Sequence, residues 1–298
     1  ELVALLFYLN YFFDPLIQLS FNYDLLRSAG SSMKKVFSIL DEKPFLSEKG
    51  ETTPLVDNEK VIEFKNVDFS YGRELVLKNI NFVINKGEKI AIVGETGAGK
   101  STIAKLVLRF YLANEGKVEF FETDANEVSQ QWVRDNVAYV PQESFLFRGT
   151  IRDNLIYSDP KNINLEDELA SIGVLSWFDR YENRLDQEVG ERGGNISAGE
   201  RQFVALLRAV LAKRQIIVFD EATANLDIES ESSILEATNQ LLSFQTSIVI
   251  AHRLETILNA EKIMVVKEGN LVGFDNHDNL LKNNEIYKEL FSAWNLVN

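Results

Sequence analysis

The chain opens with a long apolar stretch. Residues 2–23 are mostly hydrophobic, but Asn10, Asp14, Pro15 and Gln18 interrupt the roughly 20 clean apolar residues that a free-standing membrane span needs. A membrane helix and a buried helix of a soluble protein both remain open on hydropathy alone. The chain starts at Glu1 with no basic segment ahead of this stretch, so we interpret it as a fragment rather than a secretory precursor.

The hydrophobic pattern changes twice before residue 60. Between residues 21 and 40, apolar side chains recur at three- and four-residue spacing, which predicts one face of an amphipathic helix. These side chains are Leu25, Ala29, Met33, Val36, Phe37 and Leu40. Residues 41–59 are charged, contain Pro44, Gly50 and Pro54, and lack periodicity, as is typical of a linker. We therefore expect a helical segment over 1–40, a linker over 41–59 and the main domain over 60–298.

Composition limits the classes of protein that this chain can represent. Its 298 residues are 45% hydrophobic, which is enough for a proper core and argues against disorder. The formal net charge of -14 opposes binding to nucleic acid. There is no cysteine, which excludes disulfides, thiolate zinc sites and a cysteine nucleophile.

A glycine-rich loop follows the strand-like run at residues 89–93 and leads into a helical pattern. It has the sequence GETGAGKST and matches G-x-x-x-x-G-K-[ST] in the strand, loop and helix order that gives this motif its meaning. Its backbone N–H groups and the dipole of the following helix suit a triphosphate, although a glycine-rich turn with an incidental lysine is the alternative. We expect Lys100 to neutralise phosphate oxygens and Ser101 to bind Mg²⁺. The candidate nucleotide ligands are Gly94, Glu95, Thr96, Gly97, Ala98, Gly99, Lys100, Ser101 and Thr102.

Two acids follow a second apolar run. Residues 215–219 are typical of a central parallel strand, and Asp220 and Glu221 come directly after them. Asp220 suits the outer shell of Mg²⁺, and Glu221 suits orienting or deprotonating the attacking water. Taken alone, the pair could equally be an acidic cap of the next helix.

The segment ISAGERQ, residues 196–202, resembles the signature Leu-Ser-Gly-Gly-Gln of ABC transporter nucleotide-binding domains. The helix-like residues 202–214 join it to the strand that ends at Asp220, which is the arrangement of that family. The resemblance implies that Ser197 and Gly199 bind the γ-phosphate of a nucleotide held by another subunit.

Further segments match the same family in the same order. Tyr71 resembles the aromatic residue that stacks on adenine, Gln142 the loop glutamine that contacts Mg²⁺ or water, and His252 the histidine that contacts the γ-phosphate. Without this series, Tyr71 and His252 would be interpreted as structural. Residues 188–193 resemble the segment beside an exporter's coupling helices, and 224–227 resemble the loop that crosses the dimer interface. The resemblance thus implies Glu221, His252, Gln142 and Lys100 as catalytic residues and Ser101, Gln142 and Asp220 as Mg²⁺ ligands.

The resemblance runs from about residue 61 to the C-terminus and implies an α/β fold of the P-loop NTPase class. That fold has a mixed central sheet flanked by helices, an antiparallel β subdomain and an inserted helical subdomain, here at about 149–210. It also implies a Mg-dependent ATPase that uses ATP, and a second ABC half-transporter, identical or different, as partner.

The N-terminal segment gains an interpretation from the same family. In exporter-type members, six membrane helices precede the ATPase, and residues 31–44 resemble the exit of the sixth helix. Residues 1–40 would then be the end of the last transmembrane helix and its cytoplasmic extension. Asp14 and Pro15 would face the bundle interior or a substrate cavity, since they are costly against lipid. The protein would lie in the cell membrane with its ATPase in the cytoplasm.

Some positions depart from the family pattern. Ala198 replaces a glycine and Glu200 a glutamine of the signature, and Ala224 replaces a serine that is often seen in the interface loop. These changes would fit one half of a heterodimer in which the site using this signature is the weaker one. His277 has no assigned chemistry, and we expect it at the surface or at a helix cap.

Three other functions fit the sequence less well. A soluble ABC protein of DNA repair or translation should show a basic surface or a second ATPase cassette, and neither the charge nor the apolar start favours it. A cassette that binds nucleotide without hydrolysis conflicts with Glu221 and His252. An importer subunit usually lacks a fused membrane segment.

Overall fold

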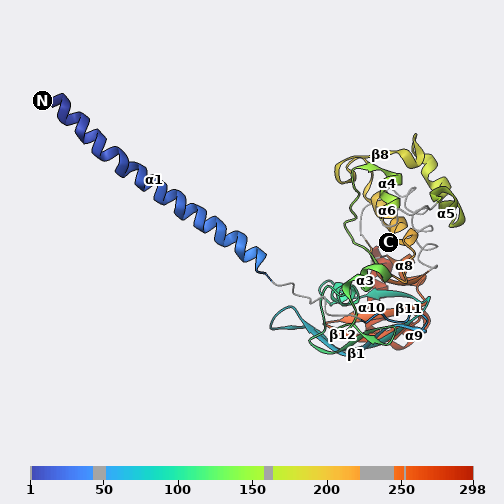
Figure 1. Cartoon of the computed structure of the whole chain (residues 1–298). Coiled ribbons are helices and arrows are strands. Elements are labelled where there is room, and N and C mark those ends of the chain that lie inside the picture. The colour runs from blue at the N-terminus through green and yellow to red at the C-terminus, as the bar shows by residue number, and fades with distance from the viewer. Residues whose placement is uncertain (1, 43–51, 158–163, 222–244, 252, 298) are drawn as a thin grey trace. The chain divides into compact units, whose positions relative to one another are not determined.

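A computed structural model describes residues 2–42, 52–157, 164–221, 245–251 and 253–297 (Figure 1). The chain divides into two compact units, Glu1–Ser47 and Glu48–Asn298, and each is described by itself.

The first unit contains one continuous helix, α1 (Leu2–Leu40). It joins the apolar and amphipathic stretches and includes Pro15, so the proline does not end it. At 39 residues it is about 58 Å long, which exceeds the roughly 30 Å of a bilayer's hydrocarbon core. It is long and apolar enough to cross a membrane, with a mean hydropathy of 1.5 in its best window.

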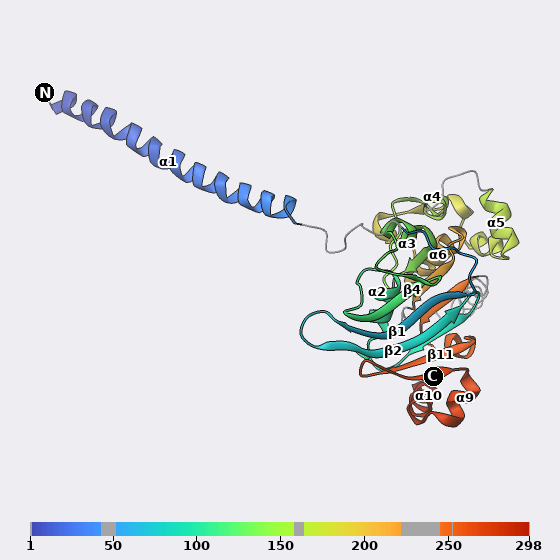
Figure 2. The same ribbon diagram turned by 60° about the horizontal axis from the view of Figure 1, so that its bottom comes forward.

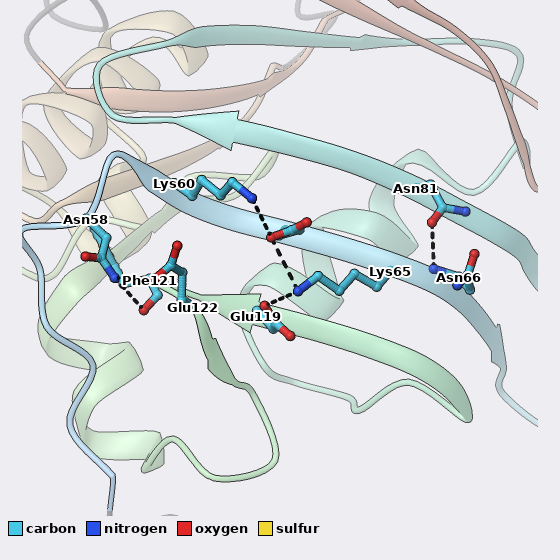
Figure 3. Close-up of polar contacts among 9 residues, drawn as sticks. Asn58, Lys60, Lys65, Asn66, Asn81, Glu119, Phe121 and Glu122 are labelled. Atoms are coloured by element: carbon cyan, nitrogen blue, oxygen red, sulfur yellow. Dashed lines mark hydrogen bonds and ion pairs between the residues drawn. The ribbon is translucent and has the colours of Figure 1, made fainter.

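The second unit contains an antiparallel sheet with the strand order β2-β1-β4-β5. Its strands are β1 (Lys60–Ser70), β2 (Leu75–Asn85), β4 (Glu115–Phe120) and β5 (Thr123–Asp124). Phe64 of β1 stacks on Phe82 of β2 with ring centroids 4.3 Å apart. On the β4 side of β1, Lys65 pairs with Glu119 at 2.7 Å, and on the β2 side the side chain of Asn81 accepts from the backbone N–H of Asn66 (Figure 3).

The central sheet is mixed, with the order β12-β11-β3-β10-β9-β6. Its strands are β3 (Lys89–Val93), β6 (Val137–Val140), β9 (Ile216–Asp220), β10 (Thr246–Ile250), β11 (Lys262–Lys267) and β12 (Asn270–Asp275). Neighbouring strands pair in parallel except β12, which is antiparallel to β11. β9 is buried on both faces because alternate side chains join different cores. Ile216 and Val218 belong to a cluster with the antiparallel sheet, and Ile217 and Phe219 to a cluster with the helical part.

The helical part gathers at the end of this unit opposite β1 and β12 (Figure 1). It contains α4 (Ile151–Ile156), α5 (Leu165–Ser171), α6 (Ala198–Leu211), the short strands β7 (Gly149–Thr150) and β8 (Glu188–Val189), and the 3-10 turns η1 (Leu175–Arg180), η2 (Arg184–Asp186) and η3 (Glu191–Gly193). Trp177 is buried and packs on Phe203 of α6, with ring centroids 4.5 Å apart, while Arg180 lies over its ring at 4.1 Å. The predicted α/β fold with a mixed sheet, an antiparallel sheet and a helical part is confirmed.

The remaining helices are α2 (Lys100–Val107), α3 (Gln130–Asn136), α8 (Leu254–Leu258), α9 (His277–Asn283) and α10 (Glu285–Val297). Figure 2 shows α9 and α10 beside β11 at the C-terminal end. The expectation for His277 needs correction. The cap of α9 is Asn276, whose side chain accepts from the N–H of Asn279. His277 is half-buried, and its Nδ1 lies 2.8 Å from the hydroxyl of Tyr287.

Candidate nucleotide site

The register of the central sheet gathers the candidate residues at one edge. In the parallel pairings, Ile92 of β3 lies opposite Ile250 of β10, Ile250 opposite Asp220 of β9, and Val140 of β6 opposite Phe219. The segments that leave these strands therefore start at the same carboxyl edge. These segments are the phosphate loop after β3, the Asp220-Glu221 pair at the end of β9, and the loop after β6 that contains the exposed Gln142. His252 and residues 224–227 lie outside the described residues.

The phosphate loop needs glycine at two positions. Gly94 has φ +150°, and a Cβ there would lie 2.1 Å from the carbonyl oxygen of Val266 in β11. Gly99 has φ +111°, and its Cβ would lie 2.7 Å from Cδ2 of Leu77. The loop backbone therefore lies in close contact with Val266 and Leu77, and a side chain at either glycine position would displace the loop.

We expect Gly94→Ala to destabilise the protein by at least about 2 kcal/mol, since a backbone carbonyl cannot move aside as a side-chain tip could. Thermal unfolding measures this loss. Gly87→Ala is the matched control, because Gly87 also has a positive φ of +81° but no atom within 4 Å of an added Cβ. Equal losses in the two variants would show that the contact with Val266 does not constrain the loop.

Lys100 begins α2 and lies against the loop. It is buried, and its Nζ donates to the carbonyl oxygens of Gly94 at 2.7 Å and Glu95 at 2.9 Å. Burial lowers the pKa of Lys100, and the charge of Asp220 partly offsets this. Burial raises the pKa of Asp220, and Lys100 opposes that shift. The charges of Lys100 at the phosphate loop and Asp220 at the end of β9 therefore act on each other.

Tyr71 is brought to the same loop from the antiparallel sheet. Its hydroxyl lies 3.3 Å from Oγ1 of Thr102 in α2. Its ring makes edge contacts with Phe69 and Tyr111, with centroids 4.9 and 5.0 Å away, and remains 49% exposed. An exposed aromatic ring held beside a phosphate loop can stack on a base.

The signature segment forms the start of α6. Ser197 is the N-cap, and its hydroxyl accepts from the N–H of Glu200 at 3.2 Å while the Glu200 carboxylate accepts from the N–H of Ser197 at 3.0 Å. This capping box gives Glu200 a local structural role at a position where the sequence departs from the family pattern. Gly199 is buried in the first turn. A contact from Nε2 of Gln202 to the Asp220 carbonyl, at 3.4 Å, ties α6 to β9.

Glu221 is held by residues that the sequence analysis did not single out. Its carboxylate accepts from the hydroxyl of Thr256 at 2.7 Å and from the N–H of Arg253 at 3.3 Å. Thr256 lies 35 residues further along the chain, and no spacing rule connects the two. The only signal in the sequence was a threonine close to His252, and residues with a hydroxyl group are too common for this to predict a role.

The candidate site residues that the structure describes suit a nucleotide that is bound together with Mg²⁺. Among the described residues, no group of three or more His, Cys, Asp or Glu side chains could hold a metal alone. Mg²⁺ that is bound together with phosphates needs only one or two protein ligands and keeps several waters. A hydroxyl at Ser101 and a carboxylate at Asp220 supply ligands of this kind.

A fold with a phosphate loop, an acidic strand end and a signature helix defines an ABC ATPase. The model of the ABC transporter family matches residues 77–224, and the chain belongs to this family as an ABC exporter nucleotide-binding domain.

The relatives and a solved structure agree with this assignment. The chain is 38% identical over 284 residues to the ATP-dependent lipid A-core flippase of Desulfotalea psychrophila, covering 94% of this chain and 49% of that protein. It is 36% identical to a fatty acid ABC transporter ATP-binding/permease protein of Mycobacterium bovis, covering 97% of this chain and 46% of the relative. A bacterial Atm1-family ABC exporter with ATP bound matches with a TM-score of 0.79 and 35% identity, covering 94% of this chain and 50% of the other. The chain thus spans about half the length of the relatives that it matches.

Proposed function

We propose that this chain hydrolyses ATP in a Mg²⁺-dependent reaction and so drives the export of a substrate across a membrane. The observation that carries the proposal is the convergence of Gly94, Asp220, Glu221 and Gln142 at one edge of the central sheet. Phosphoryl transfer needs positioning and charge neutralisation more than covalent help, and these groups supply both.

Each side chain then has one task. The phosphate loop and Lys100 hold the triphosphate, and Tyr71 stacks on adenine. Ser101, Asp220 and Gln142 would hold Mg²⁺, which when bound neutralises the developing phosphate charge. Glu221 orients or deprotonates the attacking water. His252 contacts the γ-phosphate in this proposal.

A second half-transporter completes the arrangement. Ser197 and Gly199 start α6 and would grip the γ-phosphate of ATP on the partner, so that ATP joins two such domains head to tail. Hydrolysis removes the shared anion, the dimer loosens, and the attached membrane helices change access. The variant signature fits a heterodimer in which the site that uses it is weaker.

The length and apolar composition of α1 support a membrane assignment. We propose that it contains the end of the last transmembrane helix and a cytoplasmic extension, with the ATPase in the cytoplasm. Asp14 and Pro15 would face the bundle interior or a substrate cavity, because a carboxylate against lipid is costly. Residues 41–59 then serve as a linker to a domain over 60–298, with its helical subdomain at about 149–210.

The test uses the complete transporter in liposomes. We expect phosphate release that requires Mg²⁺ and stops with a chelator, and nucleotide-dependent pairing of the ATPase domains measured by cross-linking. A protein that neither retains MgATP nor pairs in its presence contradicts the proposal. Binding with no phosphate release would instead favour a regulatory cassette, and binding to DNA or RNA would favour a soluble repair or translation factor.

A further inference from the structure

We infer that Thr256 is a positioning residue that fixes the carboxylate of Glu221. The inference rests on the proposed function and extends it to α8, which was given no role. The hydroxyl of Thr256 donates to Oε1 of Glu221 at 2.7 Å, and both side chains belong to residues that are only 3% exposed.

The second carboxylate oxygen is held by the same segment. The backbone N–H of Arg253, at the cap position of α8, donates to Oε2 of Glu221 at 3.3 Å, and Nε of Arg253 lies 3.9 Å from Oε1. The main chain of Glu221 is fixed independently, since its N–H donates to the carbonyl oxygen of Ile250 at 3.2 Å. Glu221 is therefore anchored at its backbone by β10 and at both carboxylate oxygens by residues 253–256.

This anchoring has an energetic reason. A buried carboxylate is costly unless donors and positive charge compensate it. The hydroxyl, the amide and the guanidinium supply that compensation, and Lys89 adds a further positive charge, since Glu221 raises the Lys89 pKa against the lowering by burial. Loss of the Thr256 hydroxyl leaves Oε1 without its closest donor among these contacts, and the carboxylate can then turn to other rotamers.

Loss of the Thr256 hydroxyl should slow the chemical step rather than weaken nucleotide binding. A carboxylate that must hydrogen-bond and orient an attacking water loses efficiency when it is displaced by about 1 Å, by on the order of 100-fold in enzymes that depend on positioning. Thr256 contacts the side chain of Glu221 rather than the phosphate loop. The loss should therefore appear in kcat, and the KM for ATP should stay nearly unchanged.

The experiment compares Thr256→Val and Thr256→Ser in the complete transporter. Valine keeps the shape and removes the hydroxyl, so we expect kcat to fall by about tenfold or more with the KM for ATP within about twofold of wild type. Serine keeps the hydroxyl and should restore most of the rate. Full kcat in the valine variant, or an equal loss in the serine variant, overturns the inference.

Thr246→Val is the matched control for a merely structural effect. Thr246 is equally buried, and its hydroxyl accepts from the N–H of Gly87 at 2.9 Å, at the opposite end of β10 from the site. It should lower the melting temperature as much as Thr256→Val does, with no loss in kcat. A fall in kcat that tracks the melting temperature in both variants would contradict a positioning role.

The failure of this inference is distinguishable from the failure of the proposed function. If Glu221→Gln retains turnover, the assignment of Glu221 fails first. If Glu221→Gln is inactive and Thr256→Val is fully active, only the role of Thr256 fails.

Discussion

Replacing Glu221 by glutamine is expected to stop ATP turnover while ATP binding persists. Glutamine keeps the size and one acceptor oxygen, so the contact with Thr256 can survive. It cannot accept a proton from water, and loss of a general base typically costs about 100- to 10,000-fold in rate. Because the shared γ-phosphate is no longer removed, the variant should accumulate as a closed dimer in MgATP.

Two measurements check this prediction. Phosphate release reports turnover, and cross-linking of the ATPase domains with MgATP reports the trapped dimer. Glu255→Gln is the matched control, because Glu255 is an exposed acid in the first turn of α8 and makes no contact in the proposed mechanism. Undiminished hydrolysis by Glu221→Gln would remove Glu221 from its role.

Replacing Lys100 by methionine is expected to weaken nucleotide binding strongly. Methionine keeps the length of the side chain and fits a buried position, but it removes the charge that faces the phosphates. Truncating one partner of a buried charge pair costs about 2 to 5 kcal/mol, so MgATP should bind at least about 30-fold more weakly. Hydrolysis should fall with it, because the bound complex is no longer populated.

The measurement is titration with a fluorescent ATP analogue, alongside thermal unfolding. Lys100 also donates to the carbonyl oxygens of Gly94 and Glu95, so the variant could rearrange the loop. Lys117→Met is the control, because Lys117 is an exposed lysine of β4 whose Nζ lies 3.6 Å from Asp124, outside the proposed site. Wild-type affinity in a folded Lys100→Met variant would contradict the assigned role of the lysine.

The local structure around the phosphate loop was well predicted from the sequence. The phosphate-loop motif can be recognised in the sequence because its turn, its lysine and the start of its helix lie within nine consecutive residues, Gly94 to Thr102. The strand at 89–93 was predicted for the same reason, and the strand predicted at 215–219 is observed one residue later, at 216–220, since a run of buried side chains is visible in the sequence. The family resemblance then ordered the more distant motifs, and the comparisons confirmed the family.

Contacts between side chains far apart in the chain could not be predicted, and the hydroxyl of Thr256 on Glu221, 35 residues away, is the clearest case. Glu200 was noted only as a departure from the family pattern, although the Ser-x-x-Glu spacing of residues 197–200 is that of a local capping box. The cap of α9 lies at Asn276, because its side chain accepts from the N–H of Asn279, while His277 contacts Tyr287 ten residues away.

The sequence by itself determined that this chain carries a phosphate loop, an acidic strand end and a signature helix of the ABC type. Only the tertiary structure decided which groups meet. Parallel pairing of β3, β10, β9 and β6 brings their carboxyl ends to one edge, and that register then places α8 beside Glu221. Hydrogen bonds act over about 3 Å, so contacts between residues far apart in the chain exist only once the strands are aligned.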